Sequence, residues 1–351
     1  MTTRVYAGAG HSGGAQAAAG SGLFRLVIGE DRWQRLRGGL PDNAEIRAIA
    51  IHPRDPDTIY AGTQDGPYRS TDGGEHWTAL HLPDPGMTVW SLLFHPRDAK
   101  VIYAGTAPAA IYRSDDGGDT WRRLSGFKAP GRVKMSFPCR VIRLAADPSH
   151  PNELYAGLEV DGILRSLDGG ETWEDCSHDL VKLAERPHLK SRIASDTEIE
   201  GMMDSHALAV SSAQPGTVFL AVRMGLFRSD DRGGAWQDME IGRFSPLTYA
   251  RDVQVSPHDA RTLYACLSPA ARSEAGSLYR SGDLGRSWER VDRGVTARST
   301  MMALALHAKD PNQIYCATRG GQVFGTQDAG ASWREYPLPD GVQDVYAVKC
   351  C

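Results

Sequence analysis

One eight-residue pattern, Ser-x-Asp-x-Gly-x-x-Trp, recurs along the sequence and constrains its fold more than any other feature. Five copies match it fully, and a sixth has threonine in place of serine. The copies span residues 70–77, 114–121, 166–173, 229–236, 281–288 and 326–333, and a remnant at 26–33 keeps only the tryptophan. Successive tryptophans are 44, 44, 52, 63, 52 and 45 residues apart. This spacing fits one four-stranded propeller blade with loops of variable length.

The residue types in the pattern predict a tight turn that leads into a strand. The Asp carboxylate and the Ser hydroxyl can accept hydrogen bonds from backbone N–H groups inside such a turn. Gly adopts the left-handed conformation that a Cβ would oppose, and Trp buries its indole between packed sheets. Six copies in register therefore indicate a repeated structural unit.

Each copy lies in a longer unit that predicts four strands, as at 46–51, 58–63, 68–70 and 77–80. The chain begins with a second strand at 4–8 and ends with a lone first strand at 343–348. We therefore predict an all-β fold, a seven-bladed β-propeller with Asp-box turns. Blade one would combine three N-terminal strands with one C-terminal strand, and this closure would remove exposed sheet edges.

The predicted organisation is a single domain over residues 1–351. Its blades are predicted at 3–38 with 342–350, 45–82, 88–125, 139–176, 205–240, 250–291 and 299–336. Residues 177–205 form a lid-like insertion between blades 4 and 5.

The repeated pattern closely resembles the Asp box, or bacterial neuraminidase repeat, of sialidase-like propellers, and the resemblance covers nearly the whole chain. Similar repeats occur in sialidases, xyloglucan-active glycoside hydrolases, sortilin-type receptors and photosystem II assembly factors. The resemblance thus implies a fold and leaves the function open. It also implies that the first strand of each blade lines a central channel, with the box turns on one face and the blade-to-blade connections on the other.

An alignment of the seven first strands gives one column, just inside each strand start, that is charged or aromatic in five blades. The column is Arg47, Trp90, Ile142, His206, Arg251, Met302 and Asp344. We expect a ring of these residues at the channel mouth, and a solvated rim of unrelated side chains is the alternative. Two places after Asp344, Tyr346 is the only phenol in an otherwise apolar column.

The insertion 177–205 is the longest departure from the repeat. Ser177 is expected to cap a short helix, and Ser-Asp-Thr-Glu at 195–198 predicts a capping box for a second one. The segment would deliver a set of reactive side chains to the mouth. They are Glu198, Glu200, Asp204 and His206.

Histidines on the loop face lead to a metal hypothesis. The four imidazoles are those of His11, His178, His188 and His206. With nearby carboxylates they supply enough nitrogen and oxygen ligands for a divalent metal such as zinc. No compact HExxH signature is present, so the ligands would have to converge from separate loops. Histidines exposed on a mobile lid are the alternative.

Arginines near the same mouth predict an anion site. They are Arg47, Arg140, Arg143, Arg223, Arg251 and Arg319. The guanidinium fork suits carboxylate or phosphate groups. The alternative is that these arginines pair with neighbouring carboxylates such as Glu159, Asp161, Asp252 and Asp344.

Glycoside hydrolysis is a further alternative. It requires two carboxylates about 5 to 9.5 Å apart, or in sialidases a tyrosine nucleophile with an arginine triad. Asp65, Glu200, Asp204 and Asp344 are available, with Tyr346 as the phenol. The sialidase Phe/Tyr-Arg-Ile-Pro signature is missing, because residues 24–27 read Phe-Arg-Leu-Val. Seven blades also depart from the six of typical sialidases.

The charge balance excludes some partners. The net charge of -4 argues against a nucleic-acid backbone binder. No apolar run approaches the ~18 residues that span a bilayer, and the N-terminus lacks the apolar stretch of a signal peptide. The six cysteines show no CxxC spacing, so we expect reduced thiols in a cytoplasmic protein.

Two classes of function remain. The first is a cytoplasmic hydrolase or lyase acting on a small polar or anionic molecule. In it, His206 acts as base or metal ligand, and Glu200, Asp204 and Asp344 are the acidic groups. The substrate would be bound by Arg47, Trp90, Arg140, Arg251, Arg319 and Tyr346. The second class is a non-catalytic module that holds a partner protein.

Overall fold

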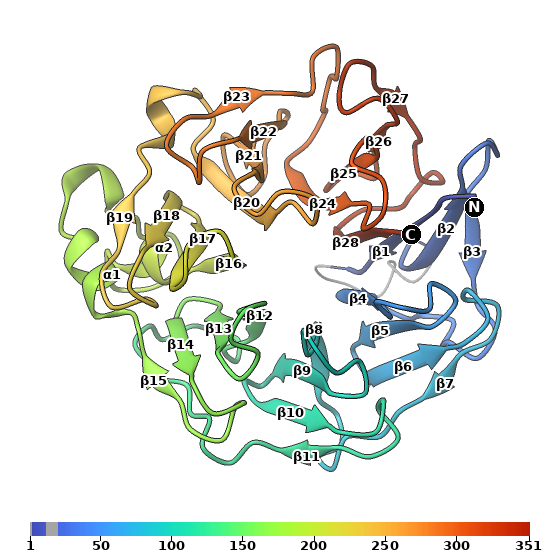
Figure 1. Ribbon diagram of the computed structural model, residues 1–351, viewed down its shortest axis with the longest axis horizontal. Helices are drawn as coiled ribbons and strands as arrows, with labels where there is room; N and C mark the ends of the chain where they lie inside the picture. The colour runs from blue at the N-terminus through green and yellow to red at the C-terminus, as the bar shows by residue number, and fades with distance from the viewer. Residues whose placement is uncertain (1, 12–19) are drawn as a thin grey trace.

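The computed structural model describes residues 2–11 and 20–351, which form seven four-stranded antiparallel sheets around a central axis (Figure 1). In each sheet the strands follow one another outward from the axis. The innermost strands are β28 (Val345–Cys350), β4 (Ala48–Ile51), β8 (Thr88–Phe94), β12 (Val141–Ala146), β16 (Ser205–Ser211), β20 (Tyr249–Val255) and β24 (Met301–Leu306). The second strands are β1 (Arg4–Ala9), β5 (Ile59–Thr63), β9 (Ile102–Ala107), β13 (Leu154–Leu158), β17 (Thr217–Val222), β21 (Leu263–Ser268) and β25 (Ile314–Thr318).

The outer half of each blade is shorter. The third strands are β2 (Gly22–Val27), β6 (Gly66–Ser70), β10 (Ile111–Ser114), β14 (Gly162–Ser166), β18 (Gly225–Ser229), β22 (Ser277–Ser281) and β26 (Val323–Thr326). The outermost strands are β3 (Gln34–Leu36), β7 (Thr78–Ala79), β11 (Arg122–Arg123), β15 (Glu174–Asp175), β19 (Gln237–Asp238), β23 (Glu289–Arg290) and β27 (Arg334–Glu335). The predicted all-β, seven-bladed fold is confirmed.

The C-terminal strand closes the ring as predicted. β28 pairs antiparallel with β1 over Val5↔Cys350 to Ala9↔Val345, so blade one has the order β28-β1-β2-β3. Backbone hydrogen bonds join Arg4 and Cys351 in both directions, at 2.9 and 3.0 Å. Figure 1 shows the two termini side by side. This pairing satisfies the backbone groups that an open edge would leave exposed.

The Asp-box turns have the hydrogen bonds that their residue types predict. In the second box, Ser114 Oγ donates to Asp116 Oδ1 at 2.8 Å and accepts from the Gly118 N–H at 2.7 Å. Asp116 Oδ1 also accepts from the Thr120 N–H at 2.9 Å. Gly118 has φ +96°, and a Cβ there would lie 2.9 Å from Leu80 Cδ1 of the preceding blade. A glycine is therefore required for both conformation and space.

The box turns also tie neighbouring blades together. The indole Nε1 of Trp121 donates to the Gly118 carbonyl at 2.9 Å, while its ring packs in a cluster with Tyr60 and Tyr112. The Tyr60 hydroxyl, from the preceding blade, donates to the Gly117 carbonyl at 2.6 Å. Tyr6 and Tyr103 repeat this bond to the next box along the chain. Each box is thus part of an interface between blades.

The insertion 177–205 packs beside blades 4 and 5. It contains the helices α1 (His178–Leu183) and α2 (Glu200–Met203), whose apolar side chains join the core cluster of those two blades. The first predicted helix is confirmed, although Ser177 Oγ hydrogen-bonds Ile163 and not the helix end. The predicted capping box at 195–198 is wrong, because Ser195 Oγ donates to the Glu200 carboxylate and α2 starts after Ile199.

In the part of the chain that the structure describes, no helix is long and apolar enough to cross a membrane. Each of the six cysteines, all of which lie within the described residues, is a free thiol.

Candidate functional site

A one-residue β-bulge recurs in the innermost strands where they reach the channel mouth. In six blades the pairing register shifts and leaves one residue unpaired. These residues are Trp90, Ile142, His206, Arg251, Met302 and Tyr346. In blade 2, Arg47 directly precedes β4. Its N–H donates to the carbonyl of Gly62, the residue that pairs with Ala48. A bulge re-aims a side chain out of the pleat, and all seven residues line one central cavity of about 620 Å³.

This ring contains six of the seven residues that the strand alignment placed in it. The exception is blade one, where Tyr346 takes the position assigned to Asp344. Asp344 precedes β28 with φ +51° and accepts a hydrogen bond from Arg319 Nε at 2.6 Å. The closing strand has no His-Pro turn to anchor an alignment, and its bulge sits two residues later than expected.

Aromatic rings and guanidinium groups alternate along one side of the mouth. The Arg47 Cζ lies 4.2 Å from the Tyr346 ring centroid and 4.8 Å from that of Trp90. The Arg140 Cζ lies 4.6 Å from Trp90, on which it stacks, and 4.5 Å from Phe137. Trp90 and Tyr346 meet edge to face, with centroids 5.7 Å apart. These cation–π contacts place the rings of Trp90 and Tyr346 side by side, and both rings line the central cavity.

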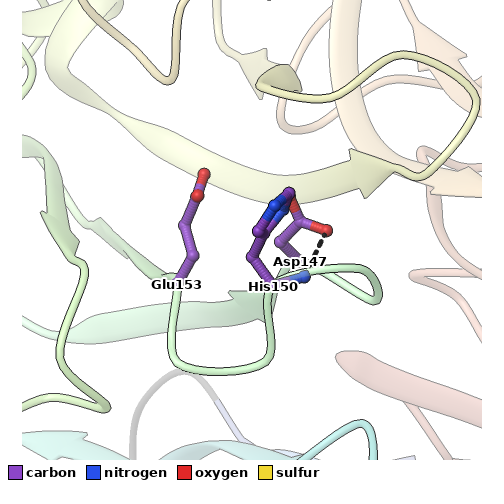
Figure 2. A group of neighbouring side chains, drawn as sticks. All are labelled: Asp147, His150 and Glu153. Atoms are coloured by element: carbon purple, nitrogen blue, oxygen red, sulfur yellow. Dashed lines mark hydrogen bonds and ion pairs between the residues drawn. The ribbon is translucent and has the colours of Figure 1, made fainter.

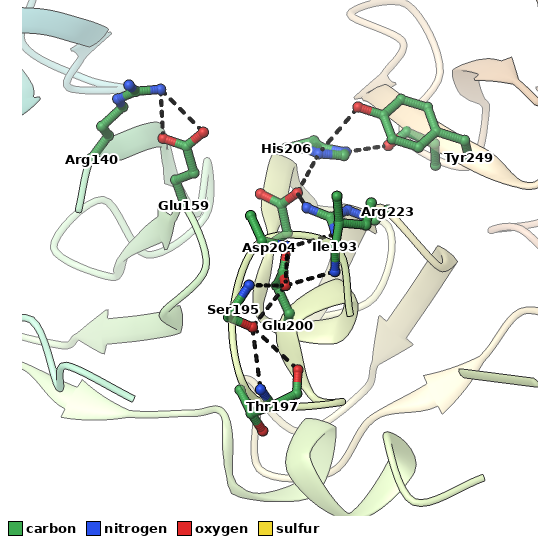
Figure 3. Close-up of polar contacts among 12 residues, drawn as sticks. Arg140, Glu159, Ile193, Ser195, Thr197, Glu200, Asp204, His206, Arg223 and Tyr249 are labelled. Carbon is green, nitrogen blue, oxygen red and sulfur yellow. Dashed lines mark hydrogen bonds and ion pairs between the residues drawn. The ribbon is translucent and has the colours of Figure 1, made fainter. Parts of the chain in front are cut away.

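A buried acidic network lies behind His206, which lines the cavity (Figure 3). The Arg223 guanidinium donates to Asp204 at 2.8 Å and to Glu200 at 2.9 Å. Asp204 Oδ2 is 3.3 Å from His206 Nε2, and His206 Nδ1 donates to the Ala250 carbonyl at 2.7 Å. The Tyr249 hydroxyl lies 3.4 Å from His206 Nε2. Asp204, Glu200 and His206 thus share one network, and of the three only His206 lines the central cavity. Their predicted catalytic role stays a prediction.

The electrostatics of this network fix its protonation. Burial would raise the pKa of Asp204, but His206 and Arg223 outweigh burial and lower it to about 2. Burial lowers the pKa of His206. The charge of Asp204 opposes this shift, and the charge of Arg251 reinforces it. Asp204 is therefore an ionised carboxylate at neutral pH.

Glu200 has a positioning role within the insertion. Its fully buried carboxylate accepts hydrogen bonds from the N–H groups of Ile193, Ala194 and Ser195, at 2.9, 3.1 and 2.9 Å. Burial opposes ionisation, but Ser195, Ile193 and Arg223 lower the pKa of Glu200 to about 2. Glu200 does not line the channel cavity. It orders the loop that leads to Asp204.

A second carboxylate near Asp204 is that of Glu159, which the sequence analysis predicted only as an ion-pair partner for an arginine. Arg140 Nη1 lies 3.1 and 2.8 Å from its two oxygens. Burial nevertheless raises the pKa of Glu159 to about 7, with Arg140 opposing and the nearby charge of Asp204 reinforcing the effect. Glu159 follows β13 in a loop, and no motif marks it. Two carboxylates with opposite pKa shifts therefore lie close enough for the charge of Asp204 to act on Glu159 (Figure 3).

The predicted metal ligands do not come together. Among the described residues, one group of three His, Cys, Asp or Glu side chains has ligand atoms within 4.8 Å of one another, namely Asp147, His150 and Glu153 (Figure 2). Its carboxylates already have partners, because Asp147 accepts from Ser149 N–H and Glu153 from the Tyr155 hydroxyl and Arg232. The group lies in a turn between strands, and we read it as structural.

The other histidines in the metal hypothesis lie apart. His178 and His188 are exposed on the insertion, 3.6 Å from Asp175 and 3.3 Å from Asp238. His11 lies at the edge of the described residues, where its carbonyl accepts a hydrogen bond from Arg47. Most of the Gly/Ala-rich loop that carries it, residues 12–19, lies outside the described part of the chain.

Seven blades, six Asp boxes and a bulged channel mouth define this chain as a seven-bladed Asp-box β-propeller. The family model for the BNR-Asp box repeat matches residues 226–239. A xyloglucanase from Hypocrea jecorina is 24% identical over 339 residues, which cover 89% of this chain and 35% of that protein. An oligoxyloglucan-reducing end-specific xyloglucanase from Emericella nidulans is 22% identical and covers 78% of this chain and 38% of that protein. The chain thus spans little more than a third of these relatives.

Solved structures share the fold. The GH74 xyloglucanase from Xanthomonas campestris superposes with a TM-score of 0.66 and 19% identity, covering 90% of this chain and 51% of that one. YCF48 from Cyanidioschyzon merolae superposes with a TM-score of 0.59 and 16% identity, covering 90% of both chains. Identities this low support the fold alone.

Proposed function

We propose that this propeller is a glycoside hydrolase whose active site is the loop-face mouth of the channel. Glu159 acts as the general acid and Asp204 as the ionised carboxylate. The observation that carries the proposal is that the charge of Asp204 acts on Glu159 while their pKa values are about 2 and about 7. Glycosidases require this division between an acid and a base or nucleophile.

In the proposed reaction, Glu159 donates its proton to the oxygen of the glycosidic bond as that bond breaks. Asp204, held by Arg223 and His206, stabilises the positive charge that develops on the sugar and directs the attack on the anomeric carbon. Water supplies the hydroxyl group of the product and returns a proton to Glu159. The rings of Trp90 and Tyr346 offer faces on which sugars can stack. The similarity to proteins named xyloglucanases supports a glucan substrate.

The test is hydrolysis of xyloglucan and of its oligosaccharides, followed by the release of reducing ends. Glu159→Gln keeps the size of the side chain and removes its proton, and we expect kcat/KM to fall by about 10² to 10⁴-fold. Glu30→Gln alters an exposed carboxylate away from the mouth and serves as the matched control. Wild-type protein that releases no product, or Glu159→Gln protein with full activity, would refute the proposal.

A non-catalytic binding module is the second candidate. It is favoured by one observation, the match in length with YCF48, since each chain covers 90% of the other. Another YCF48 structure contains a D1 peptide. Saturable binding of a glucan or peptide without any product would favour this candidate. A cytoplasmic location stays a prediction for both.

A further inference from the structure

The wall of the channel has a charge opposite to that of the whole chain. The protein carries a net charge of -4. The side chains that line the central cavity nevertheless include four basic residues and one carboxylate. They are Arg47, Arg143, Arg251, Lys349 and Asp252. Such segregation creates a positive potential in a confined space.

The single carboxylate is already used within the protein. Asp252 is 1% exposed and accepts from Arg143 Nη2 at 3.2 Å, Gln254 Nε2 at 3.1 Å and the Leu304 N–H at 3.1 Å. Its charge is matched by Arg143 and its oxygens are occupied. Asp252 therefore does not neutralise the remaining cations.

Two of those cations lack a hydrogen-bonding partner. Among the residues that the structure describes, neither the Lys349 side chain nor the Arg251 side chain makes a hydrogen bond or an ion pair. Beside them, Arg143 Nε is buried and has no hydrogen-bond acceptor. Burial and the nearby charge of Arg143 lower the pKa of Lys349. The charges of Asp204 and Glu159 act on Arg251, so Lys349 is the cation of the two with the least compensation, and a confined cation without full compensation is costly.

We propose that the channel below the ring binds an oxyanion, such as a phosphate, sulfate or carboxylate group, with Lys349 and Arg143 as its main ligands. Arg143 has donors left after its bond to Asp252 and can hold two oxygens, whereas Lys349 supplies a compact charge. Arg251 lies on the mouth side and extends the positive field. The cavity of about 620 Å³ admits either a free ion or an anionic group carried by a sugar. This site does not depend on glycoside hydrolysis.

Isothermal titration calorimetry and thermal unfolding at fixed ionic strength test the site. The probes are inorganic phosphate, sulfate and glucose 6-phosphate, with glucose and sodium chloride as controls. We expect saturable binding of at least one oxyanion, with a Kd at least tenfold weaker in Lys349→Met. Lys349→Arg restores a charge and should recover much of the affinity. The matched control is Lys128→Met, which alters an exposed lysine and should leave the Kd unchanged.

The outcomes separate the sources of the anion. Tighter binding of glucose 6-phosphate than of phosphate supports an anionic sugar, and equal binding supports a free ion. A wild-type protein that shows no saturable response beyond that of sodium chloride overturns the proposal. So does a folded Lys349→Met protein, checked by circular dichroism, that binds like the wild type. Neither result bears on xyloglucan hydrolysis.

Discussion

The six Asp-box turns and the seven-residue ring at the channel mouth both come from the repeat, but they use it in opposite ways. In the boxes the same residue types make the same bonds. Asp116 and Asp168 each accept from the N–H four residues later, a threonine in both cases, at 2.9 Å. In the ring the backbone bulge is repeated while the side chain changes from blade to blade. A repeated side chain thus marks structure, and a repeated backbone with varied side chains marks the site.

Charged groups in the box turns and at the mouth also differ in where their partners lie. Box carboxylates lie at the surface and are satisfied inside their own turn. Charges at the mouth are buried and act between blades, as when Arg251 influences both Asp204 and Glu159. Changes in a box should therefore alter local stability, whereas changes at the mouth should alter ligand binding and proton affinity.

The largest expected difference between the two regions is in the loss of stability when a tryptophan is removed from each. Trp121 is 9% exposed and packs between blades 2 and 3, whereas Trp90 faces the channel. We expect Trp121→Ala to lower the free energy of unfolding by about 3–5 kcal/mol through the cavity it leaves. Trp90→Ala should cost only about 1–2 kcal/mol, the value of its two cation–π contacts, and should weaken glucan binding if the proposed function is correct. Urea denaturation and binding assays measure both effects.

Trp90→Phe is the control, because it keeps a ring between Arg47 and Arg140. Equal losses of stability in the two alanine variants would contradict the division between structural and functional tryptophans.

A smaller effect is expected within a box turn. Asp168→Ala removes the acceptor for Thr172 and Ser166 and should cost about 1 kcal/mol at pH 7, as the loss of a helix cap does. Hydrogen bonds lower the pKa of Asp168 from 3.8 to about 2; those from Thr172 contribute most, and the one from Ser166 contributes less. The ionised carboxylate therefore contributes its full stability above pH 3.8 and loses it as the pH falls towards 2.

The difference between wild type and Asp168→Ala, measured by urea denaturation, should accordingly shrink between pH 5 and pH 3. A difference that stays constant over this interval would show that the ionised carboxylate has no part in it. Glu30→Ala, at an exposed position, controls for general effects of charge.

The repeat was sufficient to predict the fold because each box encodes its own turn locally. Spacing between tryptophans gave the blade count, and the unmatched strands at the two ends gave the closure. Six ring residues followed from aligning the inner strands. The bulges themselves were not predictable, because an extra residue in a strand leaves no trace in the pattern of apolar positions. This is why Asp344 was assigned the place that Tyr346 holds.

Glu159 and Lys349 are site residues whose importance the sequence did not predict. Glu159 looks like any loop carboxylate, and its raised pKa depends on burial and on Asp204 from the next blade. Lys349 left no signal, because the alignment that placed Asp344 in the ring also put Ala347 at the position that Lys349 holds. Its importance depends on which charges face it across the channel. Contacts between blades, unlike turns within them, are not encoded in any short segment.

The most sensitive test of coupling at the mouth is the proton affinity of Glu159. Arg251 lowers the pKa of Glu159 and Asp204 raises it. Arg251→Gln should therefore move that pKa above its value of about 7, and Asp204→Asn should move it below. The carboxyl carbon of ¹³C-labelled Glu159, followed by NMR across pH 5 to 9, reports these shifts without requiring activity. If Glu159 is the general acid, the alkaline limb of the pH–rate profile should move to higher pH in Arg251→Gln. Shifts in the same direction for both variants would mean that the two charges do not act on Glu159 directly, and the mouth would then lack the coupling that separates it from the boxes.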